Sequence, residues 1–237
     1  LNNENMIEQH KAQVAIVKEQ QKAAAPQAAE IDPALTAGFV AVAAGDGVQQ
    51  LFRDLGVQQI VSGGQTMNPS TEDILHAAEQ VPAMDVYVLP NNKNIVMAAE
   101  QAARLARTSG VRRIHVVPTT TIPQGISAMM AYDESAEIKD NVEAMQEAAS
   151  RVQSGSVTFA ARDSDYDGHQ IKEGELLALE NGKVAFTGTD LGSVTAKVAK
   201  DLMREDSQFI TLLYGADVSE EQAADVEEAV RSLLPEE

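Results

Sequence analysis

The feature that most constrains the fold of this chain is a regular alternation of apolar runs and amphipathic segments between residues 38 and 118. Segments with helical periodicity at 46–55, 70–80 and 94–107 separate four runs that are typical of strands, "GFVAVAA", "VQQIVSGG", "DVYVLPN" and "VRRIHVVPT". No Asn-Gly turn joins two of these strands, so the pattern does not favour hairpins. We therefore expect an α/β unit in which helices wrap a mainly parallel sheet.

The second half of the chain predicts a second α/β unit with a mixed sheet. We expect helices at 123–131, 134–152, 191–205 and 220–234, and strands at "SVTFAA" and "QFITLLYG". The stretch "LLALENGKVAF" predicts a β-hairpin, because Asn181-Gly182 tolerates the positive φ of a tight turn. Ser219 and Gln222 have the spacing of a capping box at the start of the last helix.

The domain organisation follows from these patterns and from the N-terminal segment. Residues 4–22 have the composition and periodicity of a helix, and "AAAPQAAEIDP" is typical of a linker. The chain starts at Leu1 rather than Met, so we expect it to be a piece of a longer protein. We predict three parts: the end of a preceding domain with its linker at 1–33, the first α/β unit at 34–130 and the second at 131–237.

The charge balance narrows the class of partner. Lys and Arg number 18 against 36 Asp and Glu, which gives a formal net charge of −18. Such a surface repels nucleic acid and anionic lipid headgroups, so neither is an expected partner. The absence of Cys excludes disulfides, thiolate chemistry and Cys-based metal sites. No signal peptide or transmembrane segment is recognisable, and we expect a cytoplasmic protein.

The loop "VSGGQTMNPSTED" at 61–73 has the shape of a phosphate-binding loop, because two glycines precede a helix. Such a loop usually carries a cation, but no Lys or Arg lies between Val61 and Leu75. Glu72 and Asp73 would occupy the first helical turn and repel a phosphate. Ser70 and Asp73 also resemble a capping box. The loop is therefore expected to bind a neutral or partner-borne group, and a purely structural turn is the alternative.

The loops that follow the four strands are rich in neutral hydrogen-bonding residues. Because the carboxyl ends of parallel strands meet at one edge of a sheet, ligands gather there. Lys93 is the one cation in these loops. Loops favour such residues in any case, but four together predict a functional edge. The candidate partner- or ligand-binding residues are Asp46, Ser62, Gly63, Gly64, Gln65, Thr66, Asn68, Asn91, Asn92, Lys93, Asn94, Thr119, Thr120 and Gln124.

Two other features resemble metal or catalytic sites but lack parts of them. "DSDYDG" at 163–168 matches the start of an EF-hand, yet the twelfth position is Gly174 instead of Glu and a strand precedes the loop, so we expect a solvated acidic turn. The four His residues have no metal-ligand spacing, and His115 is expected to be half-buried in a strand with its hydrogen bonds satisfied. No Gly-x-Ser-x-Gly motif is present. We therefore predict no metal ligand and no catalytic residue.

The chain resembles a known family in four stretches. These are "GDGVQQLFRDLGVQQIVSGGQTMNPSTEDI", "VLPNNKNI", "TTTIPQGISAMMAYD" and "DGHQIKEGELLALENGKV". Together they are similar to the C-terminal region of the ATP-binding subunit of bacterial fatty-acid kinase, a dihydroxyacetone-kinase-like family. The resemblance implies a fold like that of the substrate-binding subunit of dihydroxyacetone kinase. It also implies that "ENMIEQH" is the end of a middle domain.

The function that the resemblance implies is shared among several parts. An N-terminal kinase domain of the same polypeptide would bind ATP and magnesium, so no cofactor is expected in this chain. That domain would phosphorylate the carboxylate of a fatty acid presented by a separate acyl-binding subunit. The C-terminal region would hold this partner and is not expected to be catalytic alone. The His that binds ketones in dihydroxyacetone kinases has no match here, because His115 lies mid-strand and His76 lies past the loop.

Three hypotheses remain open on the sequence. The chain is a docking module for the acyl-binding subunit, or a domain that binds a hydroxy-ketone-like small molecule, or a structural arm that dimerises. The small molecule would contact Ser62–Thr66, Asn91–Asn94 and Thr119–Thr121.

Overall fold

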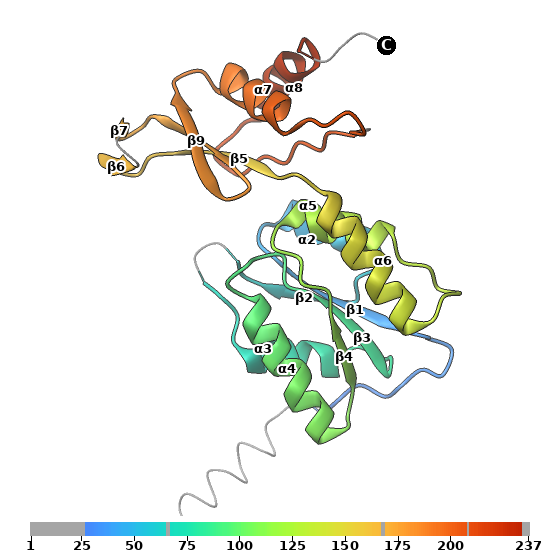
Figure 1. Cartoon of the computed structure of the whole chain (residues 1–237). Coiled ribbons are helices and arrows are strands. Elements are labelled where there is room, and N and C mark those ends of the chain that lie inside the picture. The colour runs from blue at the N-terminus through green and yellow to red at the C-terminus, as the bar shows by residue number, and fades with distance from the viewer. Residues whose placement is uncertain (1–26, 65–66, 167–168, 208, 234–237) are drawn as a thin grey trace, which may run out of the picture.

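The computed structural model describes residues 27–64, 67–166, 169–207 and 209–233 (Figure 1). The predicted helix at 4–22, the loop residues Gln65 and Thr66, and Asp167 and Gly168 of the acidic turn lie outside the described residues. Figure 1 shows two bodies, one that contains β1 to β4 and one that contains β5 to β9.

The first body is built on a four-stranded sheet whose strand pairs are all parallel. Its strands run in the order β2-β1-β3-β4, and their bounds are β1 Gly38–Ala43, β2 Gln59–Ser62, β3 Asp85–Leu89 and β4 Arg113–Val116. Every residue of β1 and β3 is buried, as expected for central strands that are covered on both faces. The predicted α/β fold with a parallel, helix-wrapped sheet is confirmed.

Five helices cover the two faces of this sheet, and the alternation of side chains along the strands gives each face its own core. Ile74 and the alanines of α4 pack with Val40 and Val42 on one face. Phe52, Ala128 and Met145 pack with Ala41 and other residues on the opposite face. The bounds are α2 Asp46–Asp54, α3 Thr71–Glu79, α4 Val96–Ser109, α5 Ile122–Met130 and α6 Ile138–Arg151.

Helix α6 contributes to the core of the first body. Met145 and Ala149 lie in the same apolar cluster as Phe39 of β1, and the Tyr87 hydroxyl donates to the Ile138 carbonyl oxygen over 3.4 Å. The sequence analysis placed α6 in the unit at 131–237, but the domain boundaries themselves remain a prediction.

The second body has a three-stranded antiparallel sheet in the order β5-β8-β9. The predicted Asn181-Gly182 turn joins β8 to β9 with φ values of 49° and 81°. Helix α7 packs on the sheet through Val194 and Val198, and the predicted capping box of Ser219 and Gln222 opens α8. The bounds are β5 Gly155–Phe159, β8 Leu176–Glu180, β9 Lys183–Gly188, α7 Leu191–Leu202 and α8 Glu220–Arg231.

Two segments differ from the expectation. The acidic stretch predicted as a turn contains two short antiparallel strands, β6 Ser164–Tyr166 and β7 His169–Ile171. The predicted strand "QFITLLYG" is wrong, since residues 209–214 form no strand and are exposed. An apolar run becomes a strand only when a neighbour completes its backbone hydrogen bonds, and no described strand pairs with this one.

Candidate functional site

The candidate site lies at the carboxyl edge of the parallel sheet, where the chain changes direction. From β1 it passes to β2 on one side and then to β3 on the other. The loops that follow β1 and β3 therefore diverge, and ligands of open α/β sheets bind at such a switch point. Asp46 follows β1 here, and Asn91 follows β3.

Asn91 is the buried centre of this edge. Its Nδ2 donates to the Val42 carbonyl oxygen over 3.0 Å, and its backbone N–H donates to Thr119 Oγ1 over 3.1 Å. Thr119 Oγ1 in turn donates to Asn91 Oδ1 over 2.8 Å. Asn91 and Thr119 thus connect the ends of β1, β3 and β4, and they position the loops through bonds that occupy their own polar atoms.

Asn92 connects the glycine loop to the segment before α4. Its Nδ2 donates to the Gly64 carbonyl oxygen over 2.5 Å, and its Oδ1 accepts from the backbone N–H of Asn94 over 2.9 Å. Gly63 and Gly64 have φ values of 155° and 108°. A Cβ on Gly63 would lie 2.8 Å from the Met67 carbonyl oxygen. The loop therefore needs its glycines in order to turn back on itself.

The N-terminus of α3 is occupied by its own side chains, as the predicted capping box requires. The Asp73 backbone N–H donates to Ser70 Oγ over 3.1 Å, and Asp73 Oδ2 accepts from the Ser70 backbone N–H over 2.8 Å. The hydrogen bonds from Ser70 lower the pKa of the Asp73 carboxyl. A carboxylate at this helix terminus disfavours a phosphate there.

Gln124 and the threonines around it close the loop after β4. Gln124 Oε1 accepts from the Thr120 backbone N–H over 2.7 Å and from Thr120 Oγ1 over 3.0 Å. Thr121 Oγ1 accepts from the Gln124 backbone N–H and lies 2.9 Å from Ser154 Oγ. The loop is thus connected to the segment that leads into β5.

Five of the predicted residues remain exposed and make no side-chain hydrogen bond to a described residue. They offer one carboxylate, one ammonium group, one hydroxyl and two amides. They are Asp46, Ser62, Asn68, Lys93 and Asn94.

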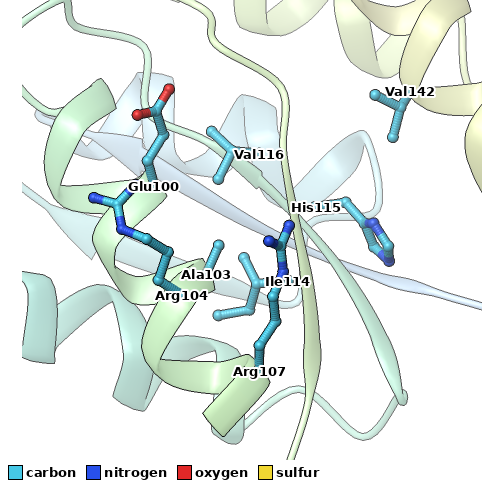
Figure 2. A pocket seen from close by; sticks show the side chains of 8 residues that line it. All are labelled: Glu100, Ala103, Arg104, Arg107, Ile114, His115, Val116 and Val142. Atoms are coloured by element: carbon cyan, nitrogen blue, oxygen red, sulfur yellow. The ribbon is translucent and has the colours of Figure 1, made fainter.

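Two hollows lie beside the end of β4, and the sequence analysis did not anticipate part of their lining. One of about 200 Å³ is bounded by Thr120 and Gln124, and also by Gln146 and Ser150 of α6. The other, of about 410 Å³, lies between α4 and α6 beside His115 (Figure 2). Gln146 and Ser150 were missed because periodicity defines the buried face of α6 but not the body against which it packs.

His115 forms a charged cluster at the opposite end of the strands. Its Nε2 lies 2.8 Å from Asp85 Oδ1, and Arg113 donates to both oxygens of the same carboxylate. Burial raises the pKa of Asp85, but the hydrogen bonds from Arg113 and His115 outweigh burial and lower it overall. The half-buried, hydrogen-bonded His115 agrees with the expectation. No group of three His, Asp or Glu side chains suited to a metal occurs among the described residues.

No helix in the described part of the chain has the length and the apolar composition needed to cross a membrane.

The family model for the C-terminal region of proteins like the A chain of fatty acid kinase, called FakA-like, matches residues 38–236. Protein YloV of Bacillus subtilis is 40% identical over 225 residues, which are 94% of this chain and 39% of that protein. An uncharacterized protein of Staphylococcus haemolyticus is 40% identical over 232 residues, 98% of this chain and 41% of its own length. The chain thus spans about two fifths of these relatives. The chain belongs to the FakA-like C-terminal family of fatty acid kinase.

Proposed function

We propose that this chain is the docking module of a fatty-acid kinase. The carboxyl edge of its parallel sheet holds an acyl-binding subunit, while a kinase domain elsewhere in the longer protein phosphorylates the fatty acid. ATP and magnesium are bound by that domain, and not by this chain. Membership of the FakA-like C-terminal family supports the proposal.

The observation that carries the proposal is the bracing of the edge loops. Asn91 connects three strand ends and Asn92 holds the Gly64 loop. The exposed side chains of Asn68, Lys93 and Asn94 are therefore presented on backbone that is already ordered. A pre-ordered surface loses little conformational entropy when a partner binds, so these polar groups are suited to recognition.

The N-terminus of α3 supports docking over nucleotide binding. In phosphate-binding loops the first helical turn is left open for the anion. Here the Asp73 carboxylate accepts the backbone N–H of Ser70 at that position. A partner that offers neutral donors and acceptors fits this edge better than a phosphate does.

The test is a calorimetric titration of this chain with the acyl-binding subunit. We predict that the double variant Asn68→Ala/Asn94→Ala weakens binding about tenfold, because each substitution removes an interfacial amide. Gln170→Ala removes an exposed amide from β7 and serves as the matched control, with unchanged affinity. Equal affinity of all variants would contradict the proposal, as would binding by the full-length protein and not by this chain.

A second candidate function is the binding of a small hydroxy-ketone. The hollow of about 200 Å³ favours it, because hydroxyl and amide side chains of Thr120, Gln124, Gln146 and Ser150 line it. The same titration with dihydroxyacetone in place of the protein partner separates the two functions. Heat release that Gln146→Ala abolishes would favour the small molecule, and its absence removes this candidate.

A further inference from the structure

The outer edge of β4 is open. The strand pairs with β3 on one side, and no other described strand pairs with it. Arg113 and Val117 donate their backbone N–H groups to carbonyl oxygens on the β3 side, over 2.8 and 3.0 Å. Since backbone groups alternate along a strand, those of Ile114 and Val116 face away from β3. Open edges of this kind are templates for pairing with another chain.

A groove follows this open edge. The two hollows have consecutive linings along β4, which reach Val116 in one and begin at Val117 in the other. They are also consecutive along α6, where Val142 is followed one turn later by Gln146. Figures 1 and 2 show β4 between α4 and α6. The groove from 114 to 120 spans about 23 Å of extended chain.

The α4 wall of the groove is basic in an otherwise acidic chain. Arg104 and Arg107 line it, with Glu100 as the one carboxylate. Arg107 makes no hydrogen bond to a described residue, whereas Arg104 is held by Gln101 Oε1 over 2.9 and 2.7 Å. Both guanidinium groups are on exposed residues. With a net charge of −18 on the chain, this wall is a local site for an anionic partner.

The other basic residues near the groove have structural partners. Arg112 is buried and donates to backbone carbonyl oxygens, among them those of Val81 and Glu79. Arg113 is paired with Asp85. Arg104 and Arg107 are thus the two arginines between residues 104 and 113 that remain for an incoming segment.

We propose that an extended acidic segment of a partner protein binds in this groove as a fifth strand next to β4. Its backbone pairs with Ile114 and Val116, and its carboxylates pair with Arg104 and Arg107. The inference does not depend on docking at the carboxyl edge.

A second copy of this chain fits the groove less well. Antiparallel pairing of two β4 edges in one continuous sheet places both α4 helices on the same face. Arg104 and Arg107 of the two copies would then oppose each other, and like charges in juxtaposition are destabilising. A segment with carboxylates meets the opposite charge instead.

The test uses this chain and two blocked peptides of alternating Val and charged residues, one with Glu and one with Lys. Exchange of the Ile114 and Val116 amides with deuterium, followed by NMR, should slow with the Glu peptide and not with the Lys peptide. Arg104→Glu/Arg107→Glu should weaken Glu-peptide binding about tenfold or more. Arg53→Glu/Arg151→Glu changes two exposed helical arginines and should leave binding within about twofold.

Val116→Pro tests the strand pairing itself. Proline removes one outward N–H and is tolerated on an edge strand whose N–H faces solvent, so the β3–β4 pairing remains while protection of Ile114 is lost. Equal binding of both peptides, no binding of either, or equal losses in the two arginine doubles would overturn the proposal. A dimer in peptide-free solution that Val116→Pro converts to monomer would assign the groove to a second copy instead.

Discussion

At the scale of single residues, Asp85 is the centre of a cluster of ionisable side chains in the first body. It lies at the start of β3, where its carboxylate joins Arg113 and His115 of β4. The amino edge of a parallel sheet lies away from its ligand-binding edge. We therefore interpret the Asp85 cluster as a stabilising contact between β3 and β4, separate from the candidate site.

Replacement of Asp85 should make stability less dependent on acid. Its pKa is lowered in the folded protein, so the ionised form contributes fully above the ordinary aspartate pKa of about 3.9 and loses its contribution as pH falls below that value. We predict that the difference in free energy of unfolding between the unmodified chain and Asp85→Asn is largest at neutral pH and shrinks toward about pH 3. Urea denaturation across this range measures it.

The matched control for this prediction is Asp46→Asn. Asp46 is exposed and makes no hydrogen bond to a described residue, so its replacement should have little effect on stability at any pH. A difference for Asp85→Asn that stays constant from about pH 7 to about pH 3 would mean that ionisation of Asp85 does not contribute to stability.

At the scale of elements, α5 and the Asn91 loop approach so closely that neither can change alone. A Cβ on Gly125 would lie 2.1 Å from Asn91 Oδ1. Alanine normally stabilises a helix by about 1 kcal/mol relative to glycine. Here we predict that Gly125→Ala lowers the free energy of unfolding by about 1–3 kcal/mol, because the added methyl group overpacks the contact.

The double variant isolates this contact. Asn91→Gly tolerates the native φ of 55° and removes the side chain that the new methyl group would meet. In that background Gly125→Ala should raise the free energy of unfolding by up to about 1 kcal/mol. Urea denaturation of the four proteins gives the coupling energy, and the same effect of Gly125→Ala in both backgrounds would exclude the contact as its cause.

The elements that sequence predicted are those whose signals are local. The alternation of 38–118 gives the parallel sheet, Asn181-Gly182 gives a hairpin, and Ser70 and Ser219 cap their helices as expected. The packing of α6 was not predictable, because its apolar stripe fits any facing surface. For the same reason the engagement of Asn91 was missed: a loop asparagine gives no sign of whether its partner is a ligand or the Val42 carbonyl oxygen.

At the scale of the whole molecule, the described surface carries one extended apolar segment that no sheet absorbs. Phe209, Leu213 and Tyr214 are 89%, 44% and 56% exposed. Contiguous apolar segments in extended conformation promote association, whereas single exposed apolar residues are ordinary. This segment therefore bears on the hypothesis of a dimerisation arm.

We predict that Phe209→Lys/Tyr214→Lys reduces self-association of this chain without loss of folding. Both side chains are exposed, so the free energy of unfolding should change by less than about 1 kcal/mol, while the added charges oppose pairing of the segment. Light scattering over a concentration series measures the association. Met97→Lys changes a side chain that is 77% exposed on α4 and should leave the scattering unchanged. If the unmodified chain is monomeric at every concentration, the segment does not mediate association and the dimerisation hypothesis loses its structural basis.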